Sequence, residues 1–539
     1  MKHKILVADP ISKEGLTALI NNPNFQLDIQ TNLSENELCE MIDSYEALIV
    51  RSQTQVTAKV LEFASHLKVV ARAGVGVDNI DINAATLNGI IVINAPDGNT
   101  ISATEHSVAM LLAMARNIPN AHASLQQGAW NRKAFRGVEL YQKTLGVIGT
   151  GRIGLGVIKR LQSFGMTVLA YDPFLTKEKA KELNIVIASL DEIAKKADFL
   201  TVHTPLTEKT KGMIGKDFFN KAKSTLQVIN VARGGIIDEA ALFEAIDKKQ
   251  IAKAAIDVFE EEPPTNSPLI SHDDIIVTPH LGASTIEAQT KVAISVSEEL
   301  VDYFEQGLIK HAINAPTLDF SNISNTAREF IKVSEIAAEL AVQLFDHAPE
   351  DIKITVSGEI VEPHADLILR SSITQLLKPH FGHRANLINA LVLLKEQEIN
   401  YQVETRTSAG SAFKNYVEIR LQHQSYSLTI GATVIEGFGP RIIRINDFSV
   451  DFQPNAYQLI TYHNDVPGIV GRTGALLGRE QINIASMSLG RNTEGGQAMM
   501  IIAVDQPITD KVIQHLKQTQ QFTKIHGTIL SIPNTESKA

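Results

Sequence analysis

The sequence predicts an α/β protein built on two doubly wound parallel sheets, with smaller α+β segments after them. Two observations support this fold class, a repeated pattern and the chain length with its hydrophobic content. Short apolar and β-branched runs alternate with helix-like stretches over residues 1–99 and again over 145–279. The chain has 539 residues, 44% of them hydrophobic, which is enough for roughly three or four buried cores.

Composition excludes several classes of function. The formal net charge of -10 disfavours nonspecific binding to nucleic acid or to an anionic membrane. Cys39 is the only cysteine, so an intrachain disulfide and a cysteine metal site are excluded, and a reducing cytosol is the expected setting. No apolar run reaches the roughly 18 residues that a membrane span needs. We therefore expect a soluble cytoplasmic protein.

The first α/β series has strand candidates at residues 5–8, 47–50, 68–71 and 90–93. Ser102 followed by Glu105 predicts a capping box, and an apolar helical face continues from it to about Arg116. Another helix-like stretch covers residues 285–304. If that helix returns the chain to the first domain, the second domain is an insertion, and the two domains face each other across a cleft spanned by two long helices.

The second α/β series contains the most informative motif. Its six strand candidates begin near residues 145, 167, 199, 226, 254 and 275. Gly149, Gly151 and Gly154 lie between the first of these strands and a helix-like stretch at 155–164. In a dinucleotide cradle, the first two glycines let the backbone approach a pyrophosphate, and the third lets the helix pack close to its strand. Taken alone, the pattern also fits an ordinary glycine-rich turn.

The strand after the cradle indicates which dinucleotide binds. Residues 167–171 are β-branched and apolar, and they end in Asp172. A carboxylate at this distance would accept hydrogen bonds from both ribose hydroxyls and would repel a 2′-phosphate. The sequence therefore predicts NAD rather than NADP as the cofactor.

Three residues able to do chemistry follow later strand candidates. Arg233, Glu262 and His280 each come just after a strand of the second series, where open parallel sheets bind their ligands. An arginine can hold a carboxylate through two hydrogen bonds, and a histidine can exchange a proton near neutral pH. Each residue alone also fits a role without chemistry. Arg233 could be a surface arginine, Glu262 could lie in a solvated acidic loop, and His280 could be a core histidine.

The ordered set of motifs resembles the D-isomer-specific 2-hydroxyacid dehydrogenase family over about residues 1–316. The matching motifs are the cradle, Asp172, Arg233-Gly234-Gly235, the run 257–263 and the run 279–284. The resemblance implies a flavodoxin-like substrate domain with an inserted Rossmann NAD domain. It also implies that Arg233 grips the substrate carboxylate, that His280 is the acid/base, and that Glu262 stabilises the protonated form of His280. This chemistry needs no metal.

The same resemblance implies further contacts with NAD. Arg152 and Ile153 would lie at the pyrophosphate, and Thr204 would lie beside the cofactor. Asp257 would accept a hydrogen bond from the nicotinamide carboxamide. The implied cofactor contacts are Val75, Gly149, Gly151, Arg152, Ile153, Gly154, Asp172, Thr204, Val231, Ala232, Arg233, Asp257, His280, Leu281, Gly282 and Ala283.

The run 73–79 resembles the family's substrate loop, whose backbone N–H groups meet the carboxylate. Arg51, and Arg132 with Lys133, could place cations around a phosphate, although a solvated charge cluster is the alternative. Their segments resemble those of family members that oxidise D-3-phosphoglycerate to 3-phosphohydroxypyruvate on the way to serine. The implied substrate contacts are Arg51, Arg72, Gly74, Val75, Gly76, Arg132 and Lys133.

Residues 457–530 follow a βαββαβ order, which predicts a ferredoxin-like unit. The run 463–468 resembles the signature of an ACT domain, a module that senses small molecules. His463, Asp465 and Asn483 are its regulatory candidates, because members of that family bind serine across a domain pair at the positions of the last two. A dimerisation module without a ligand is the alternative. We expect a homodimer or a homotetramer.

These patterns together predict the division into domains. The substrate-binding domain comprises residues 1–99 and 287–316, and the Rossmann domain comprises 100–286. An α+β intervening domain at 318–450 and an ACT domain at 456–532 follow, as in the long form of the family. Linkers are expected at 316–326 and near 446–455.

Two rival functions stay open on the sequence alone. One is a dehydrogenase for another D-2-hydroxy acid, such as glycerate, lactate or 2-hydroxyglutarate, which would not need Arg132 and Lys133. The other is a binding protein that senses NAD in the cleft and an amino acid in its terminal module. The presence of Arg233, Glu262 and His280 together argues against this second rival.

Overall fold

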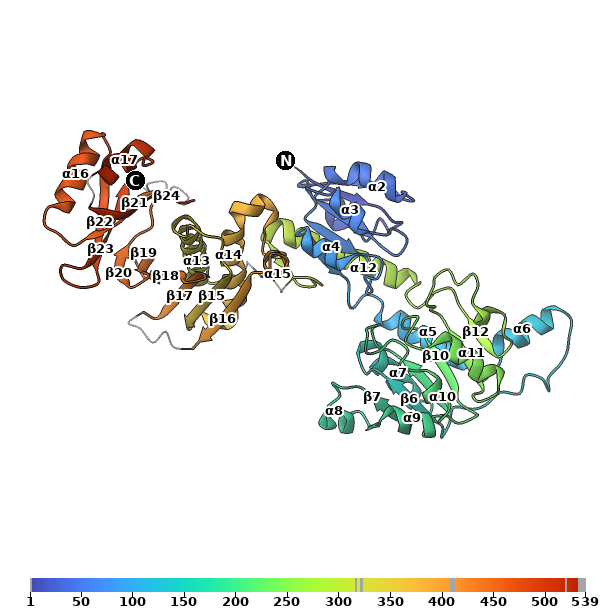
Figure 1. The fold of residues 1–539 in the computed structure, drawn as a ribbon. Coiled ribbons are helices and arrows are strands. Elements are labelled where there is room, and N and C mark those ends of the chain that lie inside the picture. The colour runs from blue at the N-terminus through green and yellow to red at the C-terminus, as the bar shows by residue number, and fades with distance from the viewer. Residues whose placement is uncertain (1, 316–317, 320–322, 408–412, 519–520, 532–539) are drawn as a thin grey trace.

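The computed structural model describes residues 2–315, 318–319, 323–407, 413–518 and 521–531. Figure 1 shows an elongated molecule, with the two N-terminal α/β bodies towards one end and the C-terminal sheet at the other. The predicted domain ends at residues 316 and 532 lie outside the described residues. Within these ranges, no helix combines the length and the apolar character needed to cross a membrane.

The first sheet has five parallel strands in the order β2-β1-β3-β4-β5, which is the flavodoxin-like order. Its strands are β1 (His3–Val7), β2 (Phe25–Ile29), β3 (Ala47–Val50), β4 (Val69–Arg72) and β5 (Ile91–Asn94). Its helices are α1 (Thr17–Ile20), α2 (Glu35–Met41), α3 (Ala58–Glu62) and α4 (Ile82–Leu87). Strand β2 was not among the predicted strands. It lies at the edge of the sheet and only Phe25 is buried, so it has no apolar run.

The second sheet is parallel and has seven strands in the order β12-β11-β10-β9-β6-β7-β8. The strands are β6 (Thr144–Ile148), β7 (Thr167–Tyr171), β8 (Ile185–Ile187), β9 (Phe199–Val202), β10 (Gln227–Asn230), β11 (Lys253–Ile256) and β12 (Ile275–Val277). The helices are α7 (Arg152–Gln162), α8 (Lys177–Glu182), α9 (Leu190–Lys196), α10 (Lys216–Phe219) and α11 (Glu239–Asp247). The expectation of six strands was wrong, because the three-residue edge strand β8 was too short to recognise. The strand order reverses between β6 and β9, so the cradle after β6 lies at the topological switch point.

Two long helices connect the two α/β bodies, as Figure 1 shows: α5 (Thr100–Ala115) and α12 (Ile286–Gln306). Helix α12 packs into the hydrophobic core of the first α/β body through Val292, Val296 and Leu300. The predicted capping box was wrong, since α5 begins at Thr100 and Ser102 is buried within it. The Ser102 hydroxyl instead hydrogen-bonds that of Thr285 at 2.7 Å, which joins the starts of both helices.

The chain after α12 forms a mixed six-stranded sheet in the order β16-β15-β17-β18-β19-β20. Its strands are β15 (Asp351–Gly358), β16 (Asn400–Arg406), β17 (Asn415–His423), β18 (Tyr426–Ile435), β19 (Gly439–Ile445) and β20 (Phe448–Phe452). Its helices are α13 (Asn325–Leu344), α14 (Val361–Phe381) and α15 (Ala390–Glu396), and a short pair, β13 (Leu308–Ile309) with β14 (Leu318–Asp319), precedes them. The linker expected near 446–455 was wrong, because β20 occupies it.

The last sheet is antiparallel, in the order β22-β23-β21-β24. Its elements are β21 (Tyr457–Asn464), α16 (Ile469–Arg479), β22 (Ile484–Arg491), β23 (Gln497–Val504), α17 (Asp510–Gln518) and β24 (Phe522–Ile529). This is the ferredoxin-like order, so the predicted unit is confirmed.

The two C-terminal sheets share one hydrophobic core. Ile460 and Met499 of the last sheet, and Leu530 just after β24, belong to the same buried cluster as the apolar face of α13. Gln343 at the end of α13 also exchanges two hydrogen bonds, of 2.7 and 2.9 Å, with the backbone of Ile529. The two C-terminal sheets therefore form a single packed half of the molecule, which we call the C-terminal half.

The C-terminal half contacts the first α/β body beside α4. The side-chain amide of Asn386 donates to the carbonyl of Gly89 at 2.9 Å, and that of Asn389 donates to Leu87 at 3.1 Å. Ile388 between them is buried in the core of the first body. Helix α4 follows the loop 73–79, so this contact lies close in sequence to the predicted substrate loop.

Candidate active site

The cradle joins β6 to α7 as the glycine pattern predicts. Gly149 has a φ of 89°, which favours glycine. A Cβ at Gly154 would overlap the carbonyl oxygen of Gly149, so only glycine lets the helix approach. At Gly151 a Cβ would meet nothing within 4 Å. Open space therefore lies at the N-terminus of α7, where backbone N–H groups attract a pyrophosphate.

Asp172 at the end of β7 lies against the cradle. Its carboxylate accepts from the N–H and hydroxyl of Thr150 at 2.7 and 2.8 Å, and from the N–H of Phe174 at 2.8 Å. Burial opposes ionisation, but these hydrogen bonds prevail and hold the pKa of Asp172 below its ordinary value. A fixed negative charge thus lies beside the cradle, as NAD selection requires.

Two other predicted cofactor contacts have informative surroundings. The Oγ1 atom of Thr204 is buried, and within the described part of the chain it has no hydrogen-bond partner. Thr204 lies beside Gly149, so this orphan hydroxyl fits a ligand in the cradle. The side chain of Arg152 instead pairs with Asp97, with Nε 2.8 Å from Oδ1, which leaves its backbone N–H for a pyrophosphate.

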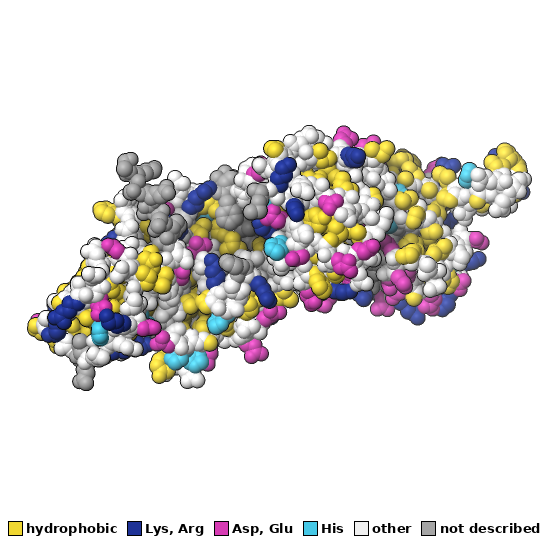
Figure 2. Space-filling view, turned by 90° about the horizontal axis from the view of Figure 1, so that it is seen from above, with side chains coloured by type: hydrophobic (Ala, Val, Ile, Leu, Met, Phe, Trp, Pro, Cys, Tyr) yellow, Lys and Arg dark blue, Asp and Glu magenta, His cyan; other side chains and the backbone are white. Residues whose placement is uncertain are grey.

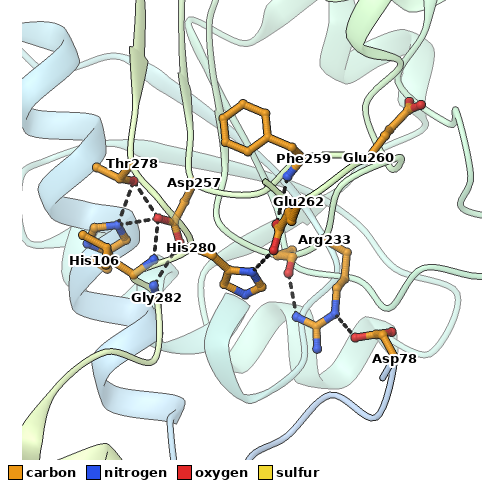
Figure 3. Close-up of polar contacts among 12 residues, drawn as sticks. Asp78, His106, Arg233, Asp257, Phe259, Glu260, Glu262, Thr278, His280 and Gly282 are labelled. Carbon is orange, nitrogen blue, oxygen red and sulfur yellow. Dashed lines mark hydrogen bonds and ion pairs between the residues drawn. The ribbon is translucent and has the colours of Figure 1, made fainter. Parts of the chain in front are cut away.

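Figure 3 shows His280, Glu262 and Arg233 close together at the carboxyl edge of the second sheet. The Nδ1 atom of His280 lies 2.7 Å from Oε2 of Glu262, and Oε1 of Glu262 accepts from the N–H of Phe259 at 3.1 Å. Burial opposes ionisation of Glu262, but the hydrogen bonds from His280 and Phe259 hold its pKa below the ordinary value. An ionised Glu262 carboxylate therefore lies against Nδ1 of His280 and orients the imidazole ring.

Asp257 holds the loop that carries His280. Its fully buried carboxylate accepts from the hydroxyl of Thr278 at 2.6 Å and from the N–H groups of Leu281 and Gly282 at 2.8 and 2.9 Å. His280 itself has a φ of 53°, a left-handed conformation that costs free energy in a non-glycine residue. The contacts of Asp257 offset this cost, so Asp257 has a role in positioning the loop as well as the predicted contact with the cofactor.

Arg233 reaches from the second body to the substrate loop of the first. Its Nε donates to Oδ2 of Asp78 at 3.0 Å, and its Nη1 donates to the carbonyl of Ala232 at 2.8 Å. Its Nη2 lies where a Cβ on Gly76 would be. A Cβ at Gly234 would overlap the carbonyl of Phe259, so this glycine is required for the turn that aims the guanidinium.

The predicted substrate loop carries a concentration of positive charge. Arg72 lies beneath Gly74, and burial followed by the charge of Arg233 lowers the pKa of Arg72 to about 10. Its Nε is buried and has no hydrogen-bond partner among the residues that the structure describes. Arg51 adds a further charge felt at Arg72. Val75 is held by Asn94, whose amide donates to the Val75 carbonyl at 2.6 Å.

Arg132 and Lys133 do not join this cluster. They follow α6 (Ile118–Gln126) on an exposed segment that Figure 1 shows projecting from the far side of the second body, away from the first. The same projection forms one end of the molecule in Figure 2. Ile118, Leu125 and Trp130 on this arm are 54%, 55% and 79% exposed. Within one chain, Arg51 lies near Arg72, whereas Arg132 and Lys133, the other two cations predicted to bind a phosphate, lie elsewhere.

The regulatory candidates Asp465 and Asn483 also lie apart from each other within one chain. Asp465 follows β21 and accepts from Arg491 at 3.2 Å, whereas Asn483 precedes β22 and donates to Asp505 at 2.7 Å. Strands β21 and β22 run in the same direction on either side of β23, so the two residues lie at opposite ends of the sheet. His463 and Asp465 line a hollow of about 670 Å³. Burial lowers the pKa of His463, which favours a neutral ring. One ligand can meet both Asp465 and Asn483 only across two copies of the domain.

Sequence reasoning missed two residues of this site. His106 on α5 lies with its Nε2 atom 3.2 Å from Oδ1 of Asp257, and a polar residue among the apolar positions of a long helix was the available signal. Asp78 was visible in the substrate loop but had no role assigned. Only the fold brings each of them to its partner, because the partners lie more than a hundred residues away.

Comparisons with known proteins find similar sequences over nearly the whole chain. Family models match three segments: the D-isomer specific 2-hydroxyacid dehydrogenase NAD binding domain at residues 108–282, the D-3-phosphoglycerate dehydrogenase intervening domain at 326–446, and the ACT domain at 457–520. The D-3-phosphoglycerate dehydrogenase of Bacillus subtilis (strain 168) is 41% identical over 528 residues, which cover 97% of this chain and 98% of that one.

Two further similarities extend the comparison. The D-3-phosphoglycerate dehydrogenase of Archaeoglobus fulgidus is 40% identical over 529 residues, which cover 98% of both chains. The crystal structure of D-lactate dehydrogenase from Aquifex aeolicus, complexed with NAD and lactic acid, is 27% identical with a TM-score of 0.51, and covers 58% of this chain and 100% of that one. The predicted fold class is confirmed by these similarities and by the strand orders.

Proposed function

Because the chain belongs to the D-3-phosphoglycerate dehydrogenase family, we propose that it oxidises D-3-phosphoglycerate to 3-phosphohydroxypyruvate with NAD, the first step of the phosphorylated route to serine. The observation that carries this proposal is the pair of His280 and Glu262, 2.7 Å apart, beside Arg233, whose side chain meets the first α/β body at Asp78. A protein that only sensed NAD would have no need of an acid/base held in this way.

The cofactor site fits NAD on the chain's own features. Gly151 leaves open space before α7, Asp172 is a fixed anion at the end of β7, and Thr204 has an orphan hydroxyl. NAD bound by these residues would supply the hydride acceptor for oxidation of the substrate at C2. Gly149 to Gly154 would hold the pyrophosphate, and Asp172 would hold the ribose. Val231, Ala232, Leu281 and Ala283 would complete the nicotinamide side, beside Asp257.

The side chains divide the remaining work. Arg233 and the N–H groups of the loop 73–79 bind the substrate carboxylate and fix its orientation. Since Nδ1 of His280 pairs with Glu262, the Nε2 atom takes the proton from the substrate hydroxyl. The Glu262 carboxylate then stabilises the imidazolium that forms, as a paired anion does for a catalytic histidine.

The phosphate would be bound by cations from two chains. Arg51 and Arg72 lie at the substrate loop, whereas Arg132 and Lys133 lie on the exposed arm with Ile118, Leu125 and Trp130. Docking of this apolar arm on a second copy would cover exposed hydrophobic surface and carry its cations to another cleft. A homodimer or a homotetramer is therefore part of the proposal.

A mixed-subunit experiment tests this part. The R132A/K133A double variant and H280A each lose turnover. Refolded together, they should regain part of it, because one mixed site then has both an intact His280 and intact arm cations. Recovery absent from the mixture would assign the arm cations to their own chain or to no site.

The C-terminal half would regulate the reaction. We propose that serine binds between two ACT domains, where Asp465 of one copy and Asn483 of another would meet it. The opposite placement of these residues supports a site across a pair. The domain division at 1–99 with 287–316, 100–286, 318–450 and 456–532 is part of the same proposal. So is a cytoplasmic location, supported by the single cysteine.

One assay tests the central proposal. Cofactor reduction is measured with D-3-phosphoglycerate, D-glycerate and D-2-hydroxyglutarate, each with and without serine. We expect the highest kcat/KM with D-3-phosphoglycerate, and inhibition by serine. Equal kcat/KM with glycerate would contradict a phosphate site. Absence of turnover with all three would favour a protein that binds NAD and an amino acid without catalysis.

A further inference from the structure

Asp78 makes a contact between the two α/β bodies. It lies in the loop between β4 and α4 of the first body, and its Oδ2 atom is 3.0 Å from Nε of Arg233, which follows β10 of the second body. Figure 3 shows the two side chains meeting at the edge of the site. The Asp78 side chain is 72% exposed, so the pair contributes little to stability. Its effect must lie in geometry.

The contacts of Arg233 fix the plane of its guanidinium. Nε donates to Asp78, Nη1 donates to the backbone of Ala232, and Nη2 lies against Gly76. Nη1 and Nη2 carry two hydrogens each, so these contacts leave one N–H of Nη1 and the N–H groups of Nη2 to bind a carboxylate beside the substrate loop. A guanidinium binds a carboxylate through two hydrogen bonds only when its fork is correctly turned, so a prearranged fork binds more tightly.

A second role for Asp78 is conceivable on charge alone. Its carboxylate could occupy the place of the substrate carboxylate on Arg233 and compete with it. The contact does not have that form, because only one oxygen of Asp78 pairs with Arg233, and it does so at Nε. The two possibilities predict opposite effects when the carboxylate is removed.

We propose that Asp78 is a positioning residue for substrate binding: it turns the guanidinium of Arg233 from across the cleft, so that the carboxylate grip is complete only when the two bodies are together. This rests on the proposed function for the identity of the substrate. It concerns a group that touches Arg233 and not the reacting atoms, and it couples closure of the cleft to recognition of a 2-hydroxy acid.

Two variants test the proposal, with a matched control. Asp78→Ala removes the acceptor, and Asp78→Asn keeps an oxygen that accepts from Nε without the charge. Asp451→Ala is the control, because Asp451 pairs with Arg441 at 2.7 Å, is 61% exposed and lies in the distant six-stranded sheet. The measurements are kcat, KM for each substrate, Tm, and calorimetric Kd values of the NADH complex for oxalate and for inorganic phosphate.

In D78A, we expect the Kd for oxalate and the KM for D-3-phosphoglycerate to rise roughly 10- to 100-fold, the usual cost of a misaligned binding group. The KM for NAD, the Kd for inorganic phosphate and the Tm should stay at wild-type values, and D78N should recover part of the loss. D451A should match the wild type throughout.

Three results would overturn the proposal. An unchanged Kd for oxalate would mean that Asp78 does not orient Arg233, and a tighter Kd would mean that it competes with the substrate. Equal weakening of oxalate and phosphate with a lower Tm would assign Asp78 a structural role. The oxalate measurement needs no turnover, so it stays decisive even if the wild type fails to oxidise D-3-phosphoglycerate, which would contradict the proposed function alone.

Discussion

Nε2 of His106 lies 3.2 Å from Oδ1 of Asp257, so a side chain of the connecting helix α5 contacts the carboxylate that holds the His280 loop. The same nitrogen is 3.3 Å from the hydroxyl of Thr278, which donates to Asp257. The pKa of Asp257 is held below its ordinary value: burial opposes ionisation, and the hydrogen bonds from His106 and Thr278 outweigh it. A helix that connects the two bodies therefore takes part in supporting the loop that carries His280, the proposed acid/base.

Replacement of His106 by alanine should slow turnover. It removes one donor from a fully buried carboxylate, a loss that costs on the order of 1–3 kcal/mol, and the loop at 280–282 should loosen. We expect kcat to fall roughly 5- to 100-fold on that basis, while the KM for NAD changes little. Steady-state kinetics of H106A, compared with H66A at an exposed histidine, checks this. Equal kcat in both variants would rule out a role for His106 in supporting the loop.

Removal of His280 tests the acid/base directly. His280→Ala should lower kcat by roughly 100- to 10,000-fold, the usual contribution of a positioned acid/base. NAD binding, measured by calorimetry, should stay nearly intact, because the cradle and Asp172 lie on other strands. Glu262→Gln should cause a smaller loss, since it keeps an acceptor for Nδ1 without the charge. Turnover near the wild-type value in H280A would contradict the assignment.

The stability contribution of Asp172 should depend on pH with a defined sign. The folded-state pKa lies below the ordinary value of 3.8, so the contribution is present above about pH 4 and is lost as the pH falls through the folded-state pKa. Asp172→Asn should therefore be less stable than the wild type by on the order of 1 kcal/mol at pH 7, and by less near pH 3. Urea unfolding at several pH values measures the difference. A gap that widened on acidification would have the wrong sign.

Gly234 should tolerate no side chain. A Cβ there would overlap the carbonyl of Phe259, which is backbone and has no flexible end to move. Gly234→Ala should destabilise the protein by about 1–3 kcal/mol or more and should lower turnover by displacing Arg233. Gly471→Ala in α16 is the matched control, because nothing lies within 4 Å of a Cβ at that position. Thermal unfolding separates the two variants, and similar Tm values would contradict the overlap.

Asn386 should matter for the placement of the C-terminal half more than for chemistry. Asn386→Ala removes the hydrogen bond to the carbonyl of Gly89, beside α4. Hydrogen exchange of residues 86–91 should become faster, while kcat stays within about twofold of the wild type, since a single hydrogen bond contributes modestly to stability. If serine acts through this contact, N386A should also be less inhibited by serine. Unchanged exchange at 86–91 would show that the contact does not order this turn.

The sequence predicted those parts of the fold and site that local patterns specify. The cradle, Asp172, Arg233, Glu262 and His280 follow strands that the apolar pattern identified, and parallel strands bring their carboxyl ends to one edge. Strands β2 and β8 were missed because edge strands bury few side chains and carry little apolar signal. The capping box failed because Ser102 and Glu105 have the right spacing, yet the backbone was already helical from Thr100.

The rest depended on relationships between distant segments. Nothing near Arg132 in the sequence shows that it lies on an arm directed away from its own cleft, and nothing near Asn483 shows that it lies at the opposite end of the sheet from Asp465. The partners of Asp78 and His106 were hidden for the same reason. The residues at the carboxyl ends of the strands were enough to predict the function. The contacts between the two bodies could be identified only from the three-dimensional structure.

The hydrogen bond between Ser102 and Thr285 has a mechanical consequence. Helices α5 and α12 both begin near this hydrogen bond, so the two chain segments that connect the bodies are joined to each other at one point. Two connecting segments joined at one point permit one body to rotate about that point, but they resist sliding of one body past the other. Any rotation of one body about this point would displace each residue in proportion to its distance from Ser102 and Thr285, so the parts of the two bodies farthest from this hydrogen bond would move most.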